Sequence, residues 1–64
     1  MRLTEFWARM EDALGEAYAA SWAAHHALTP LQSRTVNEAL ADGVAPKEIW
    51  AAVWTVLELP EASR

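Results

Sequence analysis

The sequence predicts an all-α fold, a small compact bundle of three to four short helices. Apolar residues recur at intervals of three and four along most of the 64 residues. Gly and Pro residues separate these periodic segments, as they do between short helices. No stretch alternates apolar and polar residues as a half-buried strand would. We therefore expect a single helical domain over residues 1–60 and a frayed C-terminal tail over residues 61–64.

The first predicted helix starts with Thr4 as its N-cap and Glu5 in its first turn, where a carboxylate interacts favourably with the helix dipole. Gly15 is predicted to end this helix in a left-handed cap, since a glycine inside the helix would cost about 1 kcal/mol. The apolar face that the spacing defines consists of Leu3, Phe6, Trp7, Met10, Ala13 and Leu14.

The second predicted helix runs from Glu16 to Ala27 and is rich in alanine, the strongest helix former. Its large side chains at helical spacing are Tyr18, Trp22 and His25, which we expect to face the core.

Two N-capping signals precede the third helix. Thr29 with Gln32 forms one potential capping box, with Pro30 at the first helical position. Thr35 with Glu38 forms the other. We expect a loose turn at Pro30 that becomes a regular helix only after Thr35 and stops at Gly43, although the sequence leaves both starting points open.

The fourth predicted helix begins at Pro46 and is ended by Pro60. It has the clearest amphipathic pattern in the chain. Its apolar stripe consists of Ile49, Trp50, Val53, Trp54 and Leu57. The residues expected to face away from the core are Lys47, Glu48, Ala51, Thr55 and Glu58.

Composition excludes several classes of chemistry. The chain has no cysteine, so disulfides, thiolate zinc sites and cysteine nucleophiles are excluded, and a reducing, cytoplasmic location is favoured. Its five basic residues are scattered in a chain of net charge −4, unlike the clustered cations that bind phosphate backbones. We expect neither a signal peptide nor a membrane-spanning segment.

The few polar groups that could carry chemistry lack the partners that it requires. His25 and His26 are neighbours on a helix, so they diverge by about 100° and cannot readily chelate one metal ion. We expect one of them to be buried near Trp22 and the other solvated. Ser21 lies one turn before His25, but no orienting acid or oxyanion hole is evident. We therefore expect no enzyme activity, no metal and no cofactor.

The segment from Ala39 to Ile49 has the outline of a helix-turn-helix, with a glycine in the turn. Its second helix would present Lys47, Glu48, Ala51 and Thr55 to DNA, which is one positive and one negative charge. Phosphate contacts provide most non-specific affinity for DNA, so an ordinary helical hairpin is the favoured interpretation.

Several stretches distributed over the whole chain are typical of one known family. They are Met1-Arg2-Leu3-Thr4-Glu5-Phe6-Trp7, Gly15-Glu16-Ala17-Tyr18-Ala19, Ser21-Trp22-Ala23, Arg34-Thr35-Val36-Asn37-Glu38-Ala39-Leu40 and Gly43-Val44-Ala45-Pro46-Lys47-Glu48-Ile49-Trp50. Together they resemble the short actinobacterial proteins of the domain of unknown function 3046 (DUF3046) family. That family has no established activity. Its members are often encoded near the recombinase that drives strand exchange, so the resemblance implies at most an association with recombination or DNA repair.

The aromatic residues are the remaining functional candidates. Four short helices cannot easily enclose four Trp side chains, because Trp is large and rarely buried completely. Aromatic rings left at the surface would form an apolar groove that could bind a partner protein or a second copy of the chain. Aromatic rings buried in the core would leave no such groove. We expect a protein-interaction module rather than a DNA-associated accessory protein. The candidate interaction surface consists of Phe6, Trp7, Trp50, Trp54 and Leu57.

Overall fold

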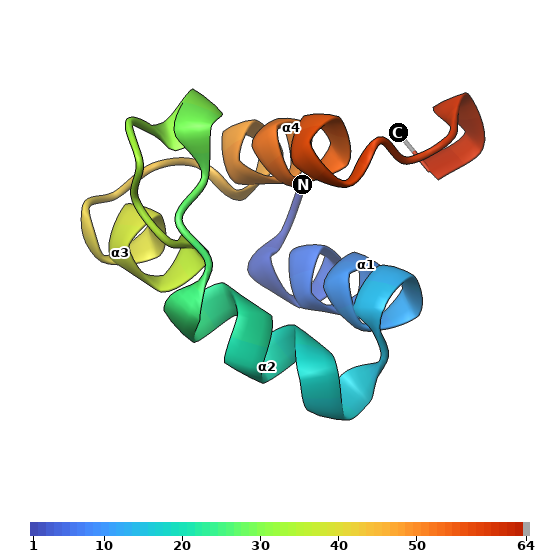
Figure 1. Ribbon diagram of the computed structural model, residues 1–64. Coiled ribbons are helices and arrows are strands. Elements are labelled where there is room, and N and C mark those ends of the chain that lie inside the picture. Colours follow the sequence, from blue (N-terminus) through green and yellow to red (C-terminus); the bar gives the residue numbers. More distant parts are fainter. Residues whose placement is uncertain (64) are drawn as a thin grey trace.

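The predicted all-α fold is confirmed by the computed structural model, which describes residues 1–63 (Figure 1). Helices α1 and α4 lie side by side across the core, with α2 and α3 completing the bundle. Leu28 and Arg34 form an isolated antiparallel bridge, and no strand occurs among the described residues. The elements are α1 (Leu3–Leu14), α2 (Glu16–His25), the 3-10 turn η1 (Thr29–Leu31), α3 (Val36–Ala41), α4 (Pro46–Leu57) and the 3-10 turn η2 (Glu61–Ser63).

The core is built around aromatic rings from three of the helices. Phe6 of α1 is completely buried and meets Trp50 of α4 edge to face, with ring centroids 6.4 Å apart. The buried apolar residues are Phe6, Met10, Ala19, Trp22, Ala23, Leu28, Leu31, Val36, Ala39, Ile49, Trp50, Ala52 and Val53. Burying aromatic side chains removes a large apolar area from water for each residue ordered, which stabilises so short a chain.

Helix α1 starts earlier than predicted. The backbone N–H of Phe6 donates to the carbonyl of Arg2, so Arg2 is the N-cap and Thr4 lies inside the first turn. The predicted stop at Gly15 is confirmed, and the Gly15 N–H donates to the Glu11 carbonyl. The predicted left-handed cap is wrong, because Gly15 combines a φ of 87° with a ψ of 146°, which lies outside the left-handed helical region.

The predicted inward face of α2 is wrong in part. Trp22 is buried as expected, but Tyr18 is 58% exposed and His25 is also exposed. The buried neighbours of Trp22 are Ala19 and Ala23, three residues before it and one after. Small side chains on this face let α2 pack closely against the core, so the larger Tyr18 and His25 lie at its margins.

The loose beginning predicted for the third helix is confirmed. Turn η1 is followed by Gln32 and Ser33, which both have positive φ, and α3 becomes regular only after Thr35. The Thr35 hydroxyl accepts from the Glu38 N–H at 3.1 Å, and the Glu38 carboxylate accepts from the Thr35 N–H at 2.8 Å. The capping box predicted for Thr29 and Gln32 is wrong. The N-cap of η1 is Leu28, and no side chain there forms a capping hydrogen bond.

Helix α4 follows the prediction closely. It begins at Pro46, after Gly43 has turned the chain with a φ of 84°. The five residues predicted to face outward are all exposed, namely Lys47, Glu48, Ala51, Thr55 and Glu58. The helix ends at Leu57, before Pro60, because Glu58 takes a left-handed conformation with a φ of 52°.

The chain after α4 bonds back to that helix, and the 3-10 turn η2 lies within the predicted C-terminal tail. The indole N–H of Trp54 donates to the Pro60 carbonyl at 3.0 Å, and that of Trp50 donates to the Ser63 carbonyl at 3.1 Å. Both bonds hold η2 against the end of α4. Arg64, the last residue of the predicted tail, lies outside the described residues. No helix within residues 1–63 combines the length and apolar character needed to cross a bilayer.

Candidate interaction surface between α1 and α4

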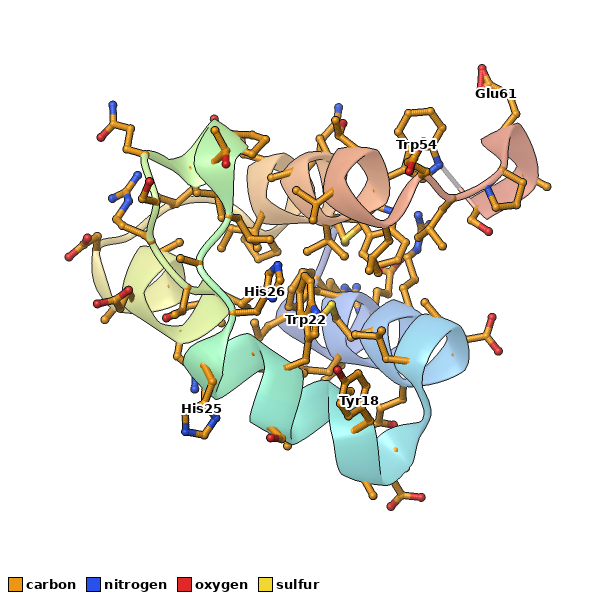
Figure 2. The ribbon with its side chains drawn as sticks, viewed as in Figure 1. Tyr18, Trp22, His25, His26, Trp54 and Glu61 are labelled. Carbon is orange, nitrogen blue, oxygen red and sulfur yellow. The ribbon has the colours of Figure 1, made fainter. Side chains whose placement is uncertain are left out.

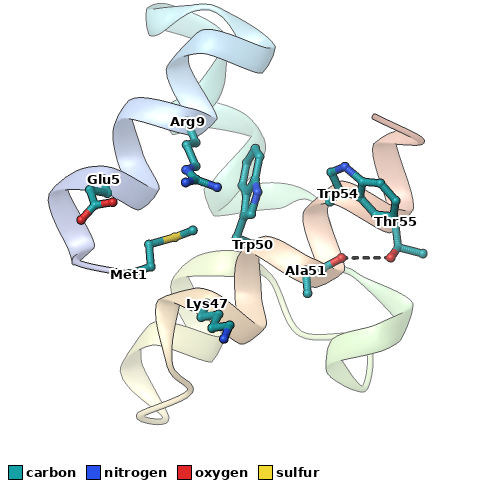
Figure 3. A pocket seen from close by; sticks show the side chains of 8 residues that line it. All are labelled: Met1, Glu5, Arg9, Lys47, Trp50, Ala51, Trp54 and Thr55. Atoms are coloured by element: carbon teal, nitrogen blue, oxygen red, sulfur yellow. Dashed lines mark hydrogen bonds between the residues drawn. The ribbon is translucent and has the colours of Figure 1, made fainter. Parts of the chain in front are cut away.

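An open groove of about 520 Å³ lies between α1 and α4 (Figure 3). Both helices run along it, so its two walls are rigid secondary structure. Met1, Glu5 and Arg9 come from the α1 side, and Lys47, Trp50, Ala51, Trp54 and Thr55 come from α4.

Two indole rings one helical turn apart form the aromatic part of the groove. Trp50 is only 3% exposed and anchors the groove to the core, whereas Trp54 is half-buried. Since the N–H groups of both rings are already bonded to the chain after α4, the surface that Trp54 offers is apolar ring. Such a surface gains free energy when a partner removes it from water.

Charged side chains border the indoles. Arg9 extends from α1 toward the space that Trp50 faces, and Lys47 lies at the other side of the groove, on the first turn of α4 (Figure 3). Glu5 is the one carboxylate among the lining residues. The lining therefore carries more positive than negative charge, in a chain whose net charge is −4.

The groove offers little support for a hydroxyl nucleophile. Thr55 supplies the only hydroxyl among its lining side chains, and that hydroxyl donates to the Ala51 carbonyl at 2.9 Å. No histidine lines the groove to act as a base toward it. The lining side chains offer apolar surface and charge to a bound molecule.

The structure brings two of the predicted surface residues, Trp50 and Trp54, into this groove. Phe6 was predicted at the surface and is 0% exposed, because its ring fills the space between α1 and Trp50. Trp7 and Leu57 are half-buried and pack against the core without lining the groove. A partner could therefore contact Trp54 directly, but neither Phe6 nor most of Trp50.

The groove residues that are not aromatic lie outside the predicted interaction surface. They are Met1, Glu5, Arg9, Lys47, Ala51 and Thr55. A signal for them exists, since Lys47, Ala51 and Thr55 follow a four-residue spacing on the outward face of α4, as Glu5 and Arg9 do on α1. The sequence does not show that these two outward faces adjoin.

A second cavity of about 390 Å³ shares Arg9 and Trp50 with the groove. Its other walls are Asp12 and Ala13 of α1 and the chain after α4, namely Leu59, Ala62 and Ser63. Arg9 and Trp50 thus separate the open groove from a space that is bounded by η2.

The histidines lie on a different face, beside a small pocket of about 160 Å³ (Figure 2). His26 stacks on Trp22, with centroids 4.8 Å apart and planes 10° apart, while His25 points away from the core. Both are exposed, so the expectation of a buried histidine is wrong. His25 Nδ1 pairs with the Ser21 carbonyl at 2.9 Å and not with its hydroxyl. Within residues 1–63, no three His, Asp or Glu side chains gather closely enough to hold a metal ion.

The helix-turn-helix outline corresponds to α3 and α4, joined by the turn around Gly43. Helix α3 has only six residues, and the exposed Lys47 and Glu48 of α4 carry opposite charges. Arg34, which precedes α3, is paired with Asp42 at 3.0 Å. This hairpin therefore presents little net positive charge to a phosphate backbone.

Fold and groove together define a small all-α protein with an open, aromatic surface groove. Residues 1–62 match the family described as Protein of unknown function (DUF3046), and the chain belongs to this family. The resemblance seen in the sequence is thereby confirmed. No curated protein and no solved structure matches the chain.

Proposed function

We propose that this DUF3046 protein is a non-enzymatic protein-interaction module that binds a partner through the groove between α1 and α4. The absence of cysteine favours its action in a reducing compartment, the cytoplasm. The observation that carries the proposal is the position of Trp54, a half-buried indole whose ring borders an open groove.

The energetics of protein interfaces support this assignment. Trp is among the residues that most often dominate binding energy, particularly where it lies in a pocket bordered by polar groups. The groove that Trp54 borders is also lined by the apolar side chains of Ala51 and Met1 and by the charged side chains of Arg9 and Lys47. Its N–H is already bonded to Pro60, so a partner need not provide a polar group for it.

Affinity purification after chemical crosslinking in the native cells tests the proposal. A partner recovered with the wild-type protein is to be purified and its binding reconstituted from the two pure proteins. We expect Trp54→Ala to weaken the reconstituted binding at least about 10-fold, the loss typical of an interface hot spot.

Two further variants separate binding from folding. Ala51→Glu places a charged side chain in the groove at an exposed helical position, so we expect it to block binding while the free energy of unfolding stays nearly unchanged. Ala20→Glu makes the same change on the exposed side of α2 and serves as the matched control. Equal binding by wild type, Ala51→Glu and Trp54→Ala would show that the groove is not the site.

A further inference from the structure

We infer that residues 59–63 form a strap that opens and closes as one unit while the four helices stay folded, and that the closed strap fixes the orientation of the Trp54 ring. We call this segment the C-terminal strap. Figure 1 shows its 3-10 turn, η2, beyond the end of α4. The opening is inferred from the contacts of the strap itself, whereas its importance for binding rests on the proposed function.

Hydrogen bonds at both ends of the strap connect it to α4. At its start, the Leu59 N–H donates to the Trp54 carbonyl at 3.1 Å. At its end, the Ser63 carbonyl accepts from the Trp50 indole N–H at 3.1 Å. Between them, the Pro60 carbonyl accepts from the Trp54 indole at 3.0 Å and from the Ser63 N–H at 2.9 Å. Because the turn in η2 presents both carbonyls to the indoles, loss of one bond weakens the others and the segment opens as a unit.

The strap buries little apolar surface. Pro60, Glu61 and Ala62 are exposed, and no residue of η2 is buried. Leu59 is the apolar anchor of the strap, since it is half-buried and packs against the core. Glu61 takes part in a further interaction, but at an exposed position where water competes with it. Since apolar burial is the main source of stability, the strap is held less firmly than the four helices.

The strap also borders a hollow. The cavity of about 390 Å³ beside the groove has Leu59, Ala62 and Ser63 on its strap side. Asp12 and Ala13 of α1 lie on its other side. Across this space the strap and α1 do not pack closely, so few dispersion contacts oppose the opening.

Glu58 provides the hinge. It has a φ of 52° and a ψ of 46°, the left-handed conformation, which is unfavourable for a residue with a side chain. The Glu58 N–H donates back to the Thr55 carbonyl, so α4 keeps its last turn when the strap opens. Rotation about the Glu58 backbone releases the unfavourable conformation and moves the strap away from the indoles. Bonds to water then replace the lost indole bonds, with a small net loss.

The closed strap determines how Trp54 is presented at the groove. The half-buried ring borders the groove, and its bond to Pro60 fixes the direction of the N–H edge. When the strap opens, this bond is lost and the ring can turn to other rotamers. A partner that recognises the closed orientation of Trp54 would therefore bind the closed state and keep the strap closed.

Hydrogen exchange of the ¹⁵N-labelled full chain, followed by NMR, tests the separate opening. The strap reporters are the Leu59 N–H and the Trp50 indole N–H, which bond at its opposite ends. The reference is the N–H of Val53, a completely buried residue of α4. We expect both strap protons to have protection factors at least about 10-fold below that of Val53 and within about three-fold of each other.

Low concentrations of urea sharpen this test. Exchange of the strap protons should be insensitive to urea below the unfolding transition, because a local opening exposes little surface. Protection equal to that of Val53, with the same urea dependence, would show that the strap opens only when the whole chain unfolds. That result would overturn the inference, as would a large difference between the two strap protons.

A pair of leucine variants assigns the opening to the contacts of the strap. Leu59→Ser removes the apolar anchor, which does not line the groove. Leu40→Ser, the matched control, makes the same change at a half-buried leucine of α3 that packs against the core. We expect Leu59→Ser to raise the ratio of the Trp50 indole exchange rate to the Val53 rate at least about five-fold. Leu40→Ser should leave this ratio nearly unchanged, and equal changes in both variants would contradict the inference. If Leu59→Ser does not fold, the exchange of the wild-type chain decides.

The order parameter of the Trp54 indole N–H tests the effect on the groove. It should fall in Leu59→Ser and not in Leu40→Ser, because the ring is released more often in the first variant. An unchanged order parameter in Leu59→Ser, together with faster strap exchange, would show that the strap does not orient Trp54.

These measurements need no partner, so they separate this inference from the proposed function. If the strap behaves as expected but Trp54→Ala binds the purified partner as well as the wild type does, the proposed function fails and the strap stands. If the strap protons exchange only with Val53 while Trp54→Ala weakens the complex, the strap inference fails and the groove is still the binding site.

Discussion

The indole N–H of Trp50 donates a hydrogen bond to the backbone carbonyl of Ser63, 3.1 Å away and thirteen residues later in the chain. Trp54, one turn further along α4, makes the equivalent bond to Pro60 at 3.0 Å. Because buried indole N–H groups need acceptors, the chain after α4 is held where its carbonyls can provide them. The same segment forms one wall of the cavity next to the groove.

Trp50→Phe should release this segment. The substitution removes one hydrogen bond and part of a buried ring, and we expect it to lower the free energy of unfolding by about 1–3 kcal/mol. Urea unfolding measures this loss, and NMR order parameters should fall for residues 61–63. Trp22→Phe truncates another buried indole and serves as the control. Order parameters over residues 61–63 that do not differ between the two variants would contradict the role of the Trp50 bond.

Thr35→Ala tests the capping box that begins α3. Loss of the Thr35 hydroxyl leaves the Glu38 N–H without its acceptor, so we expect a cost of about 1 kcal/mol in the free energy of unfolding. Thr29 is exposed and is the first residue of η1, which lacks a side-chain cap. Thr29→Ala should therefore cost less than about 0.5 kcal/mol. The prediction fails if chemical denaturation gives equal costs for the two threonines.

Gly15→Ala should destabilise the turn between α1 and α2. Gly15 has a φ of 87° and a ψ of 146°, a conformation that L-residues with a side chain avoid at a cost of about 1–3 kcal/mol. Beyond Gly15 and its two chain neighbours, no atom lies within 4 Å of the added Cβ, so the cost comes from the local backbone conformation and not from a clash with packed side chains. D-alanine, introduced by chemical synthesis, prefers positive φ and should restore most of the lost stability. Equal thermal stability of the two alanine forms would contradict this account.

Direct binding to duplex DNA should be undetectable even at low salt. The exposed surface of α4 places Lys47 beside Glu48, and too few phosphates can be neutralised for measurable affinity. A gel-shift assay at about 20 mM salt checks this, with a basic DNA-binding domain as the positive control. A shift that weakens steeply with added salt would favour the alternative, a DNA-associated accessory protein.

Local signals in the sequence predicted most of the fold. Gly15, Gly43 and Pro46 mark breaks because each requires or imposes a particular backbone conformation, whatever the rest of the chain does. The capping box of Thr35 and Glu38 is equally local, since both partners lie within four residues. Such features can be read without knowing which helices pack together.

Features that depend on packing could not be read in this way. The face of α2 was misassigned because its many alanines leave no periodic contrast, so the larger Tyr18 and His25 were expected inside. The bonds from Trp50 to Ser63 and from Trp54 to Pro60 were missed because no pattern of residue types specifies an acceptor on the backbone.

The candidate site was predicted only in its aromatic half. The amphipathic spacing places Trp54 on the apolar face of α4, and this side chain is half-buried in the structure. The same kind of spacing in α1 also selects Phe6, which is completely buried in the core. The cations were missed because Arg9 and Lys47 lie 38 positions apart and meet only through the packing of α1 on α4. A helical pattern shows which residues face outward, not which outward faces become neighbours.

A photocrosslinking comparison in living cells tests the central claim most directly. The photoreactive residue p-benzoylphenylalanine is to replace Thr55, at the border of the groove, or Ala20, on the exposed side of α2. We predict that Thr55 gives a crosslink to a discrete partner protein, that Ala20 does not, and that adding Ala51→Glu abolishes the Thr55 product. Crosslinks that form from Ala20 and not from Thr55 would contradict the assignment of the groove as the binding site.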